Sequence, residues 1–489
     1  MKRKILFLKP YDFMHTEYNG TSNPQFSPIF PCSLATVLSW CKSHLGEDEF
    51  SFYGLDGYLF QDRMEGVLRE VALIDPDYIV SNINVLTFHL VESYYRNMKG
   101  KAKLIGLINK AFPEDMVARY GDLFDAIIEK DWCSSTLSVI VAAEDGEIGK
   151  SPGVWLRDEG GKPYFTGKGE PHYISDYPLP AYREFHGERY NSFFSYWTEG
   201  CKYGCIFCSF GTAVYGRWRA RPIESILEEL KELYSIIKRP MYILNIDNEL
   251  TLQREWAEDL FEAIEKASLP LSIDTNIRAN HVDEEFIRSM KRGGITRVGF
   301  SLESSDSDVL QLNKKKLNWE DVDRTIRLLK KHNIIFQVYI MQGMYGSNRQ
   351  KDIDTFRYVV DEMKVRNVGL GVTLPYRSTP YYRVLKKKEW IEDFTLDNYL
   401  WVGSHVYKYS FFDKPVGTKP FWRISDDYTF EEAVDTYMHL AELKPRKKLF
   451  ADFVKPLMFG NPSVFGGYIR SVCRSPGYYI GKMIRYVRN

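Results

Sequence analysis

Short apolar runs alternate with segments of helical spacing over most of this chain of 489 residues, and this pattern limits the fold more than any other feature. In the first third, apolar runs at 4–9, 50–54, 78–81 and 103–107 are separated by helical patterns at 33–45, 61–74 and 91–98. Strands that alternate with helices at this spacing predict a parallel sheet with helices on both faces. We therefore expect an α/β protein that opens with a doubly wound, Rossmann-like domain over residues 1–150.

The same alternation returns, with longer helices, over residues 191–385. The expected strands are 193–198, 241–246, 271–276, 297–301, 335–341 and 368–374. Six consecutive right-handed units of this kind curl into a partial (β/α)6 TIM-type barrel, whose strands point their carboxyl ends at one mouth. Any chemistry is expected at that mouth.

Two further ranges lack the alternation. Residues 151–190 are rich in Gly, Pro and aromatic residues, which predicts a linker strap between domains. Residues 386–489 predict a mixed, partly helical extension. Its last part, 441–489, holds ten Lys or Arg against two acidic residues, interleaved with aromatic residues. Such a tail can make peripheral contact with anionic lipid, and the alternative is a cap over the barrel mouth with a solvated basic face.

Overall charge and cysteine usage narrow the partners and the compartment. The 65 basic residues balance the 65 acidic ones, which argues against nucleic acid as a partner. The sequence lacks a run of about 18 apolar residues, and its first residues enter a core strand instead of a cleavable leader. Seven cysteines, three of them between 201 and 208, are not a disulfide framework. We therefore expect a cytoplasmic protein, with the basic tail as a candidate for membrane contact.

The three clustered cysteines, Cys201, Cys205 and Cys208, are the most informative motif in the chain. Their spacing lets three thiolates on one tight loop reach three corners of a cubane, and soft thiolate ligands suit iron and sulfide. One iron of such a cluster is left without a protein ligand. A structural zinc site is an alternative, although it normally closes with four ligands, often as two spaced pairs. The remaining alternative is that the three cysteines lie close together by chance and bind no metal.

This loop resembles the signature of the radical SAM superfamily, in which an aromatic residue, here Phe207, precedes the last cysteine. The resemblance covers about residues 193–380. It implies a 4Fe-4S cluster whose free iron binds S-adenosylmethionine, and an external electron donor such as flavodoxin or ferredoxin. One electron then cleaves the sulfonium to a 5′-deoxyadenosyl radical, which can take hydrogen from an unactivated carbon.

Other positions resemble the superfamily more loosely. Asp247 and Asn248 follow the second barrel strand, where relatives hold the amino group of S-adenosylmethionine, and helix capping is the alternative role for both. Asn276 and Arg278 end the third strand, where relatives place an arginine beside the methionyl carboxylate.

The fourth strand ends in Glu303 and Ser304, which resembles the superfamily's Gly-x-x-x-Glu-Ser strand near the nucleoside. The range 341–346 matches the position of a glycine-containing turn that borders the adenine. Substrate contacts are expected from the ends of strands five and six, around Tyr345, Tyr376 and Arg377, where packing is an equally good explanation.

A doubly wound domain, a proline-rich strap and then this barrel together resemble the cobalamin-binding subfamily of radical SAM enzymes. The resemblance implies cobalamin outside the carboxyl ends of the first domain's strands, facing the barrel mouth. The sequence departs from the subfamily around His15, which lacks the spacing of an Asp-x-His-x-x-Gly turn and reads as a loop or pocket histidine. Gly106 to Asn109 likewise replaces the usual Gly-Gly-x-His patch.

Three functions follow from these observations. The leading one is a cobalamin-dependent radical SAM methyltransferase acting on an unactivated carbon of a small-molecule or lipid-like substrate. The second keeps the radical step without corrinoid, as a cyclase, a coupling enzyme or an oxidative enzyme. The third, of another class, is a non-enzymatic iron-sulfur or zinc protein that binds RNA through its basic tail.

Overall fold

The computed structural model describes residues 2–11, 29–60, 63–108, 112–169, 172–190, 192–210, 217–247, 249–409, 412 and 414–445. Four predictions fall outside these residues. They concern His15, Asn109, Asn248 and the basic tail beyond residue 445.

The first sheet belongs to the N-terminal part of the chain and is doubly wound, as expected. Its parallel strands are β1 (Arg3–Lys9), β3 (Phe50–Asp56), β4 (Tyr78–Ile83), β5 (Lys103–Ile108) and β6 (Ala126–Ile128). They lie in the order β3-β1-β4-β5-β6, so the chain reverses direction across the sheet between β1 and β4. In open α/β sheets, ligands bind outside the carboxyl ends of the strands at such a reversal.

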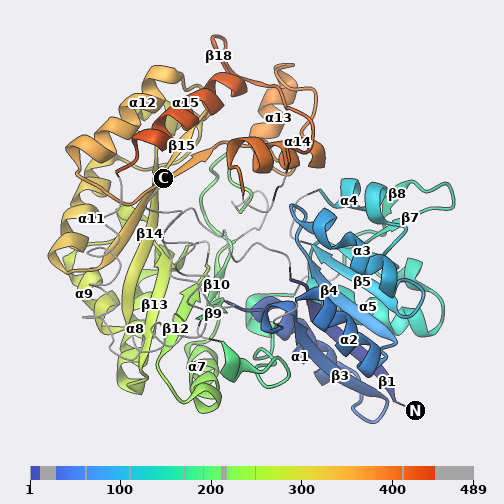
Figure 1. Cartoon of the computed structure of the whole chain (residues 1–489). Helices are drawn as coiled ribbons and strands as arrows, with labels where there is room; N and C mark the ends of the chain where they lie inside the picture. The colour runs from blue at the N-terminus through green and yellow to red at the C-terminus, as the bar shows by residue number, and fades with distance from the viewer. Residues whose placement is uncertain are drawn as a thin grey trace.

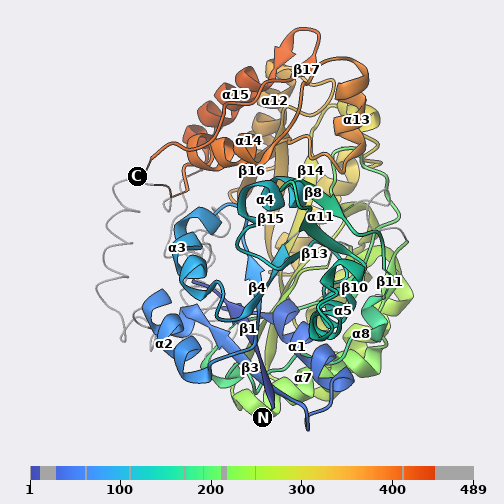
Figure 2. The same ribbon diagram turned by 90° about the vertical axis from the view of Figure 1, so that its right-hand side faces the viewer.

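Helices cover both faces of this sheet. Successive residues of each strand point to opposite faces, and because both sets are largely apolar, both faces must be buried. The helices are α1 (Cys32–His44), α2 (Met64–Ile74), α3 (Phe88–Met98), α4 (Pro113–Tyr120) and α5 (Trp132–Glu144). Along β1, Ile5 and Phe7 enter one hydrophobic cluster and Leu6 and Leu8 enter another. Figure 2 shows α2 and α3 on one side of the sheet and α1 and α5 on the other.

The first sheet extends further along the chain than the sequence indicated. Two short strands, β7 (Val154–Arg157) and β8 (Pro163–Phe165), add to its edge antiparallel to β6 and to each other. Both lie in the range predicted to be a linker strap. A hairpin at a sheet edge has few apolar residues, so its pattern resembles a loop.

The second sheet is the predicted partial barrel, with six parallel strands in chain order from β9 to β16. They are β9 (Ser192–Ser195), β12 (Met241–Asn245), β13 (Leu271–Asn276), β14 (Ile295–Glu303), β15 (Ile335–Gln342) and β16 (Val368–Val372). The seventh strand, β2 (Ile29–Phe30), comes from the N-terminal part of the chain and pairs parallel with β9 at the edge.

Helices cover the outer side of this second sheet, away from the first domain (Figure 1). They are α7 (Ile223–Ile237), α8 (Arg254–Ala267), α9 (Glu284–Arg292), α10 (Ser307–Leu312), α11 (Trp319–Lys331) and α12 (Arg349–Arg357). Several begin at side-chain caps: Asp283, Asn318 and Asn348 each accept a hydrogen bond from a first-turn amide of their helix.

The C-terminal extension contacts both the barrel and the first domain. Its described elements are α13 (Pro380–Lys387), α14 (Leu396–Trp401), the π-helical turn Val402–Val406, β17 (Arg423–Ser425), β18 (Tyr428–Thr429) and α15 (Phe430–Leu443). The α15 helix packs on α12, β15 and β16, as a barrel helix would. At the other end, Asp115 of α4 accepts from the amide of Leu396 (2.9 Å), and Arg119 pairs with Asp397 (2.7 Å). Among the described residues, none of the helices is long and apolar enough to cross a membrane.

Candidate active site

The carboxyl ends of the barrel strands open into one cavity of about 1630 Å³. Its lining comes from both domains: the cysteine loop and the strand ends on one side, and α1, the start of α5 and residues 172–180 on the other. The predicted site residues in this lining are Cys201, Cys205, Phe207, Cys208, Asp247, Asn276, Arg278 and Glu303. The cavity exceeds the roughly 300 to 1,000 Å³ of an ordinary ligand pocket, so it can hold more than one ligand.

The three cysteines lie on the loop between the short strands β10 (Thr198–Glu199) and β11 (Arg219–Ala220). The amide of Phe210 donates to Sγ of Cys208 (3.3 Å). Burial raises the pKa of Cys208 to about 11, and the nearby Lys315 ammonium opposes that shift. Burial also raises the pKa of Cys201. Without a metal these side chains are therefore held as neutral thiols, and a bound metal would favour their ionised form.

The spacing of the three cysteines along the loop suits a cubane cluster, and their role as its ligands stays a prediction. Within the described ranges, no group of three Cys, His, Asp or Glu side chains surrounds a single ion. A cluster does not need such convergence, because each thiolate binds a different iron. The amide donor to Cys208 and the cations near the loop are the groups that stabilise the cluster's negative charge.

Arg278, predicted to face the methionyl carboxylate, contacts both the cysteine loop and the turn that contains Lys315 and Lys316. Its guanidinium carbon lies 3.6 Å from the ring centroid of Tyr203, between the first two cysteines. Its Nη2 donates to the carbonyls of Lys315 and Lys316, the second at 2.8 Å. The hydroxyl of Tyr203 also lies 2.6 Å from Nε2 of His281. The side chain is 7% exposed and lines the cavity, so it positions the loop from the side of the binding space.

Asp247 is a buried carboxyl in the cavity wall, and hydrogen bonds from Trp197, Thr198 and Asn245 partly offset its burial. It is 2% exposed, and its Oδ1 accepts from the amide of Trp197 (2.8 Å). Its Oδ2 is buried without a hydrogen-bond partner among the described residues. Burial raises the pKa of this carboxyl to about 6. Because a buried unsatisfied oxygen is costly, a cationic ligand such as an ammonium fits this position in the cavity wall.

The remaining predicted residues divide between the cavity and the packing around it. Glu303 ends β14 and accepts from Nζ of Lys315 (3.0 Å) in a buried ion pair. Asn276 is exposed to the cavity, and its Oδ1 would lie 2.7 Å from any Cβ at position 299, which explains Gly299. Ser304 instead contacts Thr355 of α12 (3.4 Å), behind the strand end.

The three expected substrate contacts also separate. Tyr376 lines the cavity and packs on Phe112 of the first domain, with ring centroids 6.1 Å apart. Arg377 pairs with Asp393 (2.7 Å) and Asp115 (3.3 Å), so it joins the extension to α4. Tyr345 packs between Tyr381 and Trp390.

The sequence did not predict three polar residues that line the cavity, Asp274, Arg297 and Gln337, here called the polar floor of the barrel. Arg297 of β14 lies 3.4 Å from Asp274 of β13 and donates to Oε1 of Gln337 (3.2 Å) on β15. All three line the cavity. The signal was available: Asp274 stands two residues before Asn276, on the same face of the strand.

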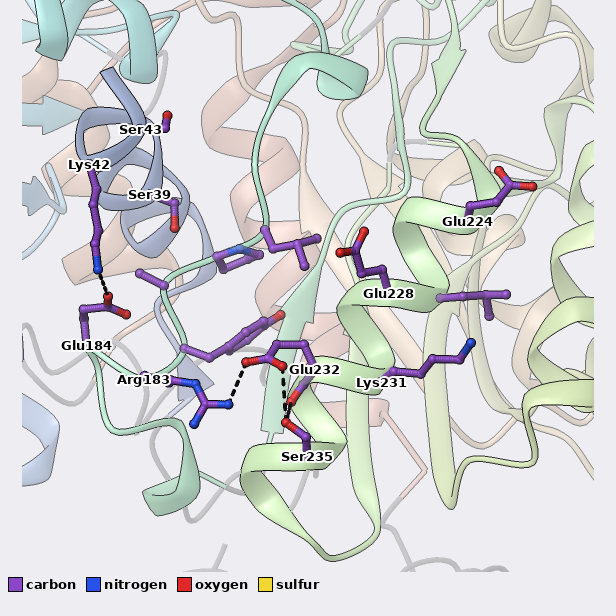
Figure 3. Close-up of a pocket in the computed structure, with 15 residues that line it drawn as sticks. Ser39, Lys42, Ser43, Arg183, Glu184, Glu224, Glu228, Lys231, Glu232 and Ser235 are labelled. Atoms are coloured by element: carbon purple, nitrogen blue, oxygen red, sulfur yellow. Dashed lines mark hydrogen bonds and ion pairs between the residues drawn. The ribbon is translucent and has the colours of Figure 1, made fainter. Parts of the chain in front are cut away.

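A second hollow, of about 960 Å³, lies between α1, residues 179–184 and α7 (Figure 3). Its charged lining is largely satisfied within the protein: Lys42 pairs with Glu184 (2.9 Å), and Arg183 pairs with Glu232 (2.9 Å). Its lining contains none of the three clustered cysteines. The catalytic chemistry is therefore assigned to the larger cavity.

The family model of the radical SAM superfamily matches residues 195–359, the range that holds the cysteine loop and most of the barrel. This range of the chain is therefore a radical SAM domain. The radical SAM domain implies a 4Fe-4S cluster and S-adenosylmethionine, and these enzymes act on small molecules. This match favours an enzyme over the non-enzymatic RNA-binding protein that the sequence left open.

Two curated relatives carry methyltransferase names. The chain is 21% identical over 395 residues to an uncharacterized methyltransferase of Pyrococcus horikoshii, covering 77% of this chain and 81% of that one. It is 24% identical over 224 residues to bacteriochlorophyllide d C-12(1)-methyltransferase of Chlorobaculum tepidum, covering 45% of this chain and 47% of that one.

Solved structures match over both domains. The radical SAM methyltransferase TsrM from Kitasatospora setae, with cobalamin and a [4Fe-4S] cluster bound, gives a TM-score of 0.61 at 17% identity, covering 79% of this chain and 75% of that one. The cobalamin-dependent S-adenosylmethionine radical enzyme OxsB gives 0.61 at 14% identity, covering 80% and 62%. The arrangement of a doubly wound domain, a partial barrel and part of the extension is thus a known fold.

Proposed function

We propose that this enzyme is a cobalamin-dependent radical SAM methyltransferase that acts on an unactivated carbon of a small molecule. The observation that carries the proposal is the single cavity, which joins the cysteine loop and the barrel strand ends to the first domain. Methyl transfer to a substrate radical needs a methyl donor and a radical generator on either side of one substrate. TsrM and OxsB share this two-domain fold and hold cobalamin, which supports the same use here.

We assign the cluster to Cys201, Cys205 and Cys208, and the amino group of S-adenosylmethionine to Asp247. When bound, the cluster and S-adenosylmethionine supply the 5′-deoxyadenosyl radical, and cobalamin supplies the methyl group. The protein's own contribution is positional. Arg278 holds the cysteine loop through Tyr203, and the unpaired Oδ2 of Asp247 orients an ammonium toward it.

Cobalamin is assigned to the part of the cavity that the first domain lines. We extend that domain to Phe165, because β7 and β8 continue its sheet. The loop after β6 and the start of α5 contribute Glu129, Asp131 and Trp132 to the lining. Together with Trp155 and Phe165 of the same lining, Trp132 offers apolar surface and the two acids offer polar groups, which suits a ligand with a large apolar surface and a few polar groups.

The substrate is expected to place a polar group on the floor made by Asp274, Arg297 and Gln337. Its apolar body would then lie against Tyr376 and Tyr339, which line the same cavity. A lipid-like molecule meets this description. Membrane contact through the basic tail stays a prediction, because residues 446–489 lie outside the described part of the chain.

Anaerobic reconstitution with iron, sulfide, S-adenosylmethionine and cobalamin tests the proposal. We expect corrinoid to copurify with the chain, and reductant to yield both 5′-deoxyadenosine and S-adenosylhomocysteine with a methylated product from cell extract. A cyclase or an oxidative enzyme that works without corrinoid would yield 5′-deoxyadenosine alone. The absence of corrinoid binding and of S-adenosylhomocysteine would therefore overturn methyl transfer while leaving the radical step intact.

A further inference from the structure

The turn formed by residues 313–316, between α10 and α11, lies directly against the cysteine loop. All four of its carbonyl oxygens face inward. The first accepts from the amide of Ile206 (3.1 Å), and the second lies 3.6 Å from Sγ of Cys205. The third and fourth accept from the guanidinium of Arg278. This segment, here called the lysine turn, therefore forms the wall between one cluster-binding cysteine and the outer surface.

The backbone of the lysine turn decides where its side chains point. Lys314 and Lys316 have φ values of 54° and 47°, in the left-handed region that residues other than glycine seldom adopt. Lys315 between them turns inward and pairs with Glu303 (3.0 Å), whereas Lys314 and Lys316 are exposed. Within the described ranges, neither exposed lysine forms an ion pair. Two strained positions thus present two unpaired cations beside Cys205.

The surface around the lysine turn has the composition of a protein contact. Leu312 and Trp319, which flank it in sequence, are each 48% exposed. In the cysteine loop itself, Lys202 and Gly204 are exposed, and an added Cβ at Gly204 would meet nothing within 4 Å. Exposed apolar side chains close in sequence to unpaired cations, with open access to the loop at Gly204, suit a transient partner. The exposed acids Asp308 and Glu320 mark its limits along the chain.

We propose that the lysine turn, with Lys202, Leu312 and Trp319, is the docking surface for a small acidic protein that delivers single electrons. This inference rests on the proposed radical function, which consumes one electron for each S-adenosylmethionine cleaved. The reduced donor loses one electron and the cluster gains it, with no atom or proton transferred. The path is short, because the carbonyl of Lys314 contacts Cys205 and Lys314 itself is exposed.

Electrostatic attraction explains why such a small patch is sufficient. Electron-transfer partners form small, short-lived interfaces, and opposite charges raise their rate of encounter. Because the chain as a whole is neutral, attraction of an acidic donor to this face depends on local charge, here the exposed lysines of the lysine turn. Substituting a charged residue at the rim of an interface mainly changes the association rate and its dependence on salt, and changes the dissociation rate less.

The test compares two charge reversals of equal size. The first variant is Lys314→Glu/Lys316→Glu. The control is Lys238→Glu/Lys364→Glu, whose lysines are also exposed and also have positive φ, 51° and 54°. Lys238 and Lys364 precede β12 and β16, so they lie at the opposite, amino end of the barrel strands. The control therefore matches charge, exposure and backbone conformation.

Two measurements are made on the full-length, cluster-loaded chain. The first is the rate of 5′-deoxyadenosine formation with photoreduced flavodoxin and, separately, with titanium(III) citrate. The second is the binding of labelled oxidised flavodoxin by fluorescence anisotropy at about 50 and about 300 mM NaCl. We expect the Lys314/Lys316 variant to lose about tenfold in rate and affinity with flavodoxin only, with a weaker salt dependence. The control should behave as the unmodified chain.

Each outcome decides a separate claim. Equal flavodoxin rates and affinities in both variants would overturn the docking surface, and so would a loss that is the same with titanium citrate, since that indicates damage to the cluster. If the unmodified chain forms no 5′-deoxyadenosine with either reductant, the proposed radical function is wrong. The anisotropy measurement then still decides whether the lysine turn binds an acidic electron carrier.

Discussion

Two buried aspartates at the carboxyl ends of parallel strands, one in each sheet, show how the two halves of the molecule differ. Asp56 ends β3 of the first sheet, and Asp247 follows β12 of the second; each is 2% exposed. Both oxygens of Asp56 are used: Oδ1 accepts from the amide of Tyr58 (2.9 Å) and Oδ2 from the hydroxyl of Tyr190 (2.7 Å). In Asp247 only Oδ1 has such a partner among the described residues.

This difference in hydrogen bonding distinguishes a carboxylate that stabilises the fold from one that is available to a ligand. A carboxylate with satisfied oxygens stabilises its own surroundings, as Asp56 does where the first domain meets Tyr190. A carboxylate with a buried, unsatisfied oxygen lowers stability until a ligand arrives. Asp247 is therefore the better candidate for binding a charged group, whereas Asp56 stabilises the first domain.

The largest expected effect concerns two cysteines that line the same cavity from opposite domains. Cys205→Ala should abolish the iron-sulfur absorption and reduce 5′-deoxyadenosine formation by about 10³-fold or more, because a cubane with two protein ligands is not retained. Cys133→Ala, in α5 of the first domain, should leave iron content unchanged. Iron analysis and absorption spectra of both variants check this. Equal iron loss in the two would contradict the assignment of the loop.

The next contrast is between a buried and an exposed ion pair. Lys315→Met leaves Glu303 buried without its cation, and we expect a loss of about 3–5 kcal/mol in the free energy of unfolding. Lys103→Met, which removes an exposed pair with Asp125 on the first sheet, should cost less than about 1 kcal/mol. Urea denaturation measures both. Similar losses would show that the barrel edge is no more desolvated than the first sheet.

Replacing each of the two aspartates by asparagine should change the free energy of unfolding in opposite directions. The folded-state pKa of Asp247 is about 6, above its ordinary value of 3.8, so the folded protein loses stability as pH rises between these values. Asp247→Asn should therefore raise the free energy of unfolding at neutral pH by up to about 3 kcal/mol. It should also weaken S-adenosylmethionine binding by about 10- to 100-fold.

Asp56→Asn should do the reverse, with a loss of about 1–3 kcal/mol and unchanged affinity, because Tyr190 loses its acceptor. Denaturation curves and calorimetric titration with S-adenosylmethionine measure both quantities. If Asp247→Asn destabilised the chain without affecting affinity, the ammonium assignment would be wrong.

The smallest expected effect is the pH dependence of the affinity for S-adenosylmethionine. Below a pKa of about 6 the Asp247 carboxyl becomes neutral, so affinity for S-adenosylmethionine should fall about tenfold for each further pH unit. Above that value affinity should be constant. Titrations between about pH 5 and pH 8 check the slope, with Asp247→Asn as the pH-independent control. A slope that persists in this variant would assign the titration to another group.

The sequence predicted most of the framework because local periodicity determines it. The helix expected at 33–45 agrees with α1 to within one residue at each end, and the strand expected at 271–276 coincides with β13. The edge strands β2 and β7 escaped prediction because two to four residues carry no detectable period. Their pairing depends on neighbours that are distant in sequence.

The site was predictable only where one residue type at one spacing has a chemical meaning. Cys201, Cys205 and Cys208 meet that condition and all line the cavity, and their role as cluster ligands stays a prediction. The contacts of Arg278 did not, because a Tyr203 ring 75 positions earlier and two carbonyls beyond residue 314 engage its guanidinium. Asp274 and Arg297 likewise needed the register of β13 and β14 before they could be recognised as a pair.

The two residues of β2 have a consequence for any attempt to divide this protein. They hydrogen-bond along β9, so removing the amino-terminal segment would uncover the outer strand of the barrel sheet. A bare strand of that kind invites sheet-to-sheet association between molecules. Truncated versions that begin at the barrel should accordingly precipitate unless residues 29–30 are supplied, and the two halves are best regarded as parts of one indivisible unit.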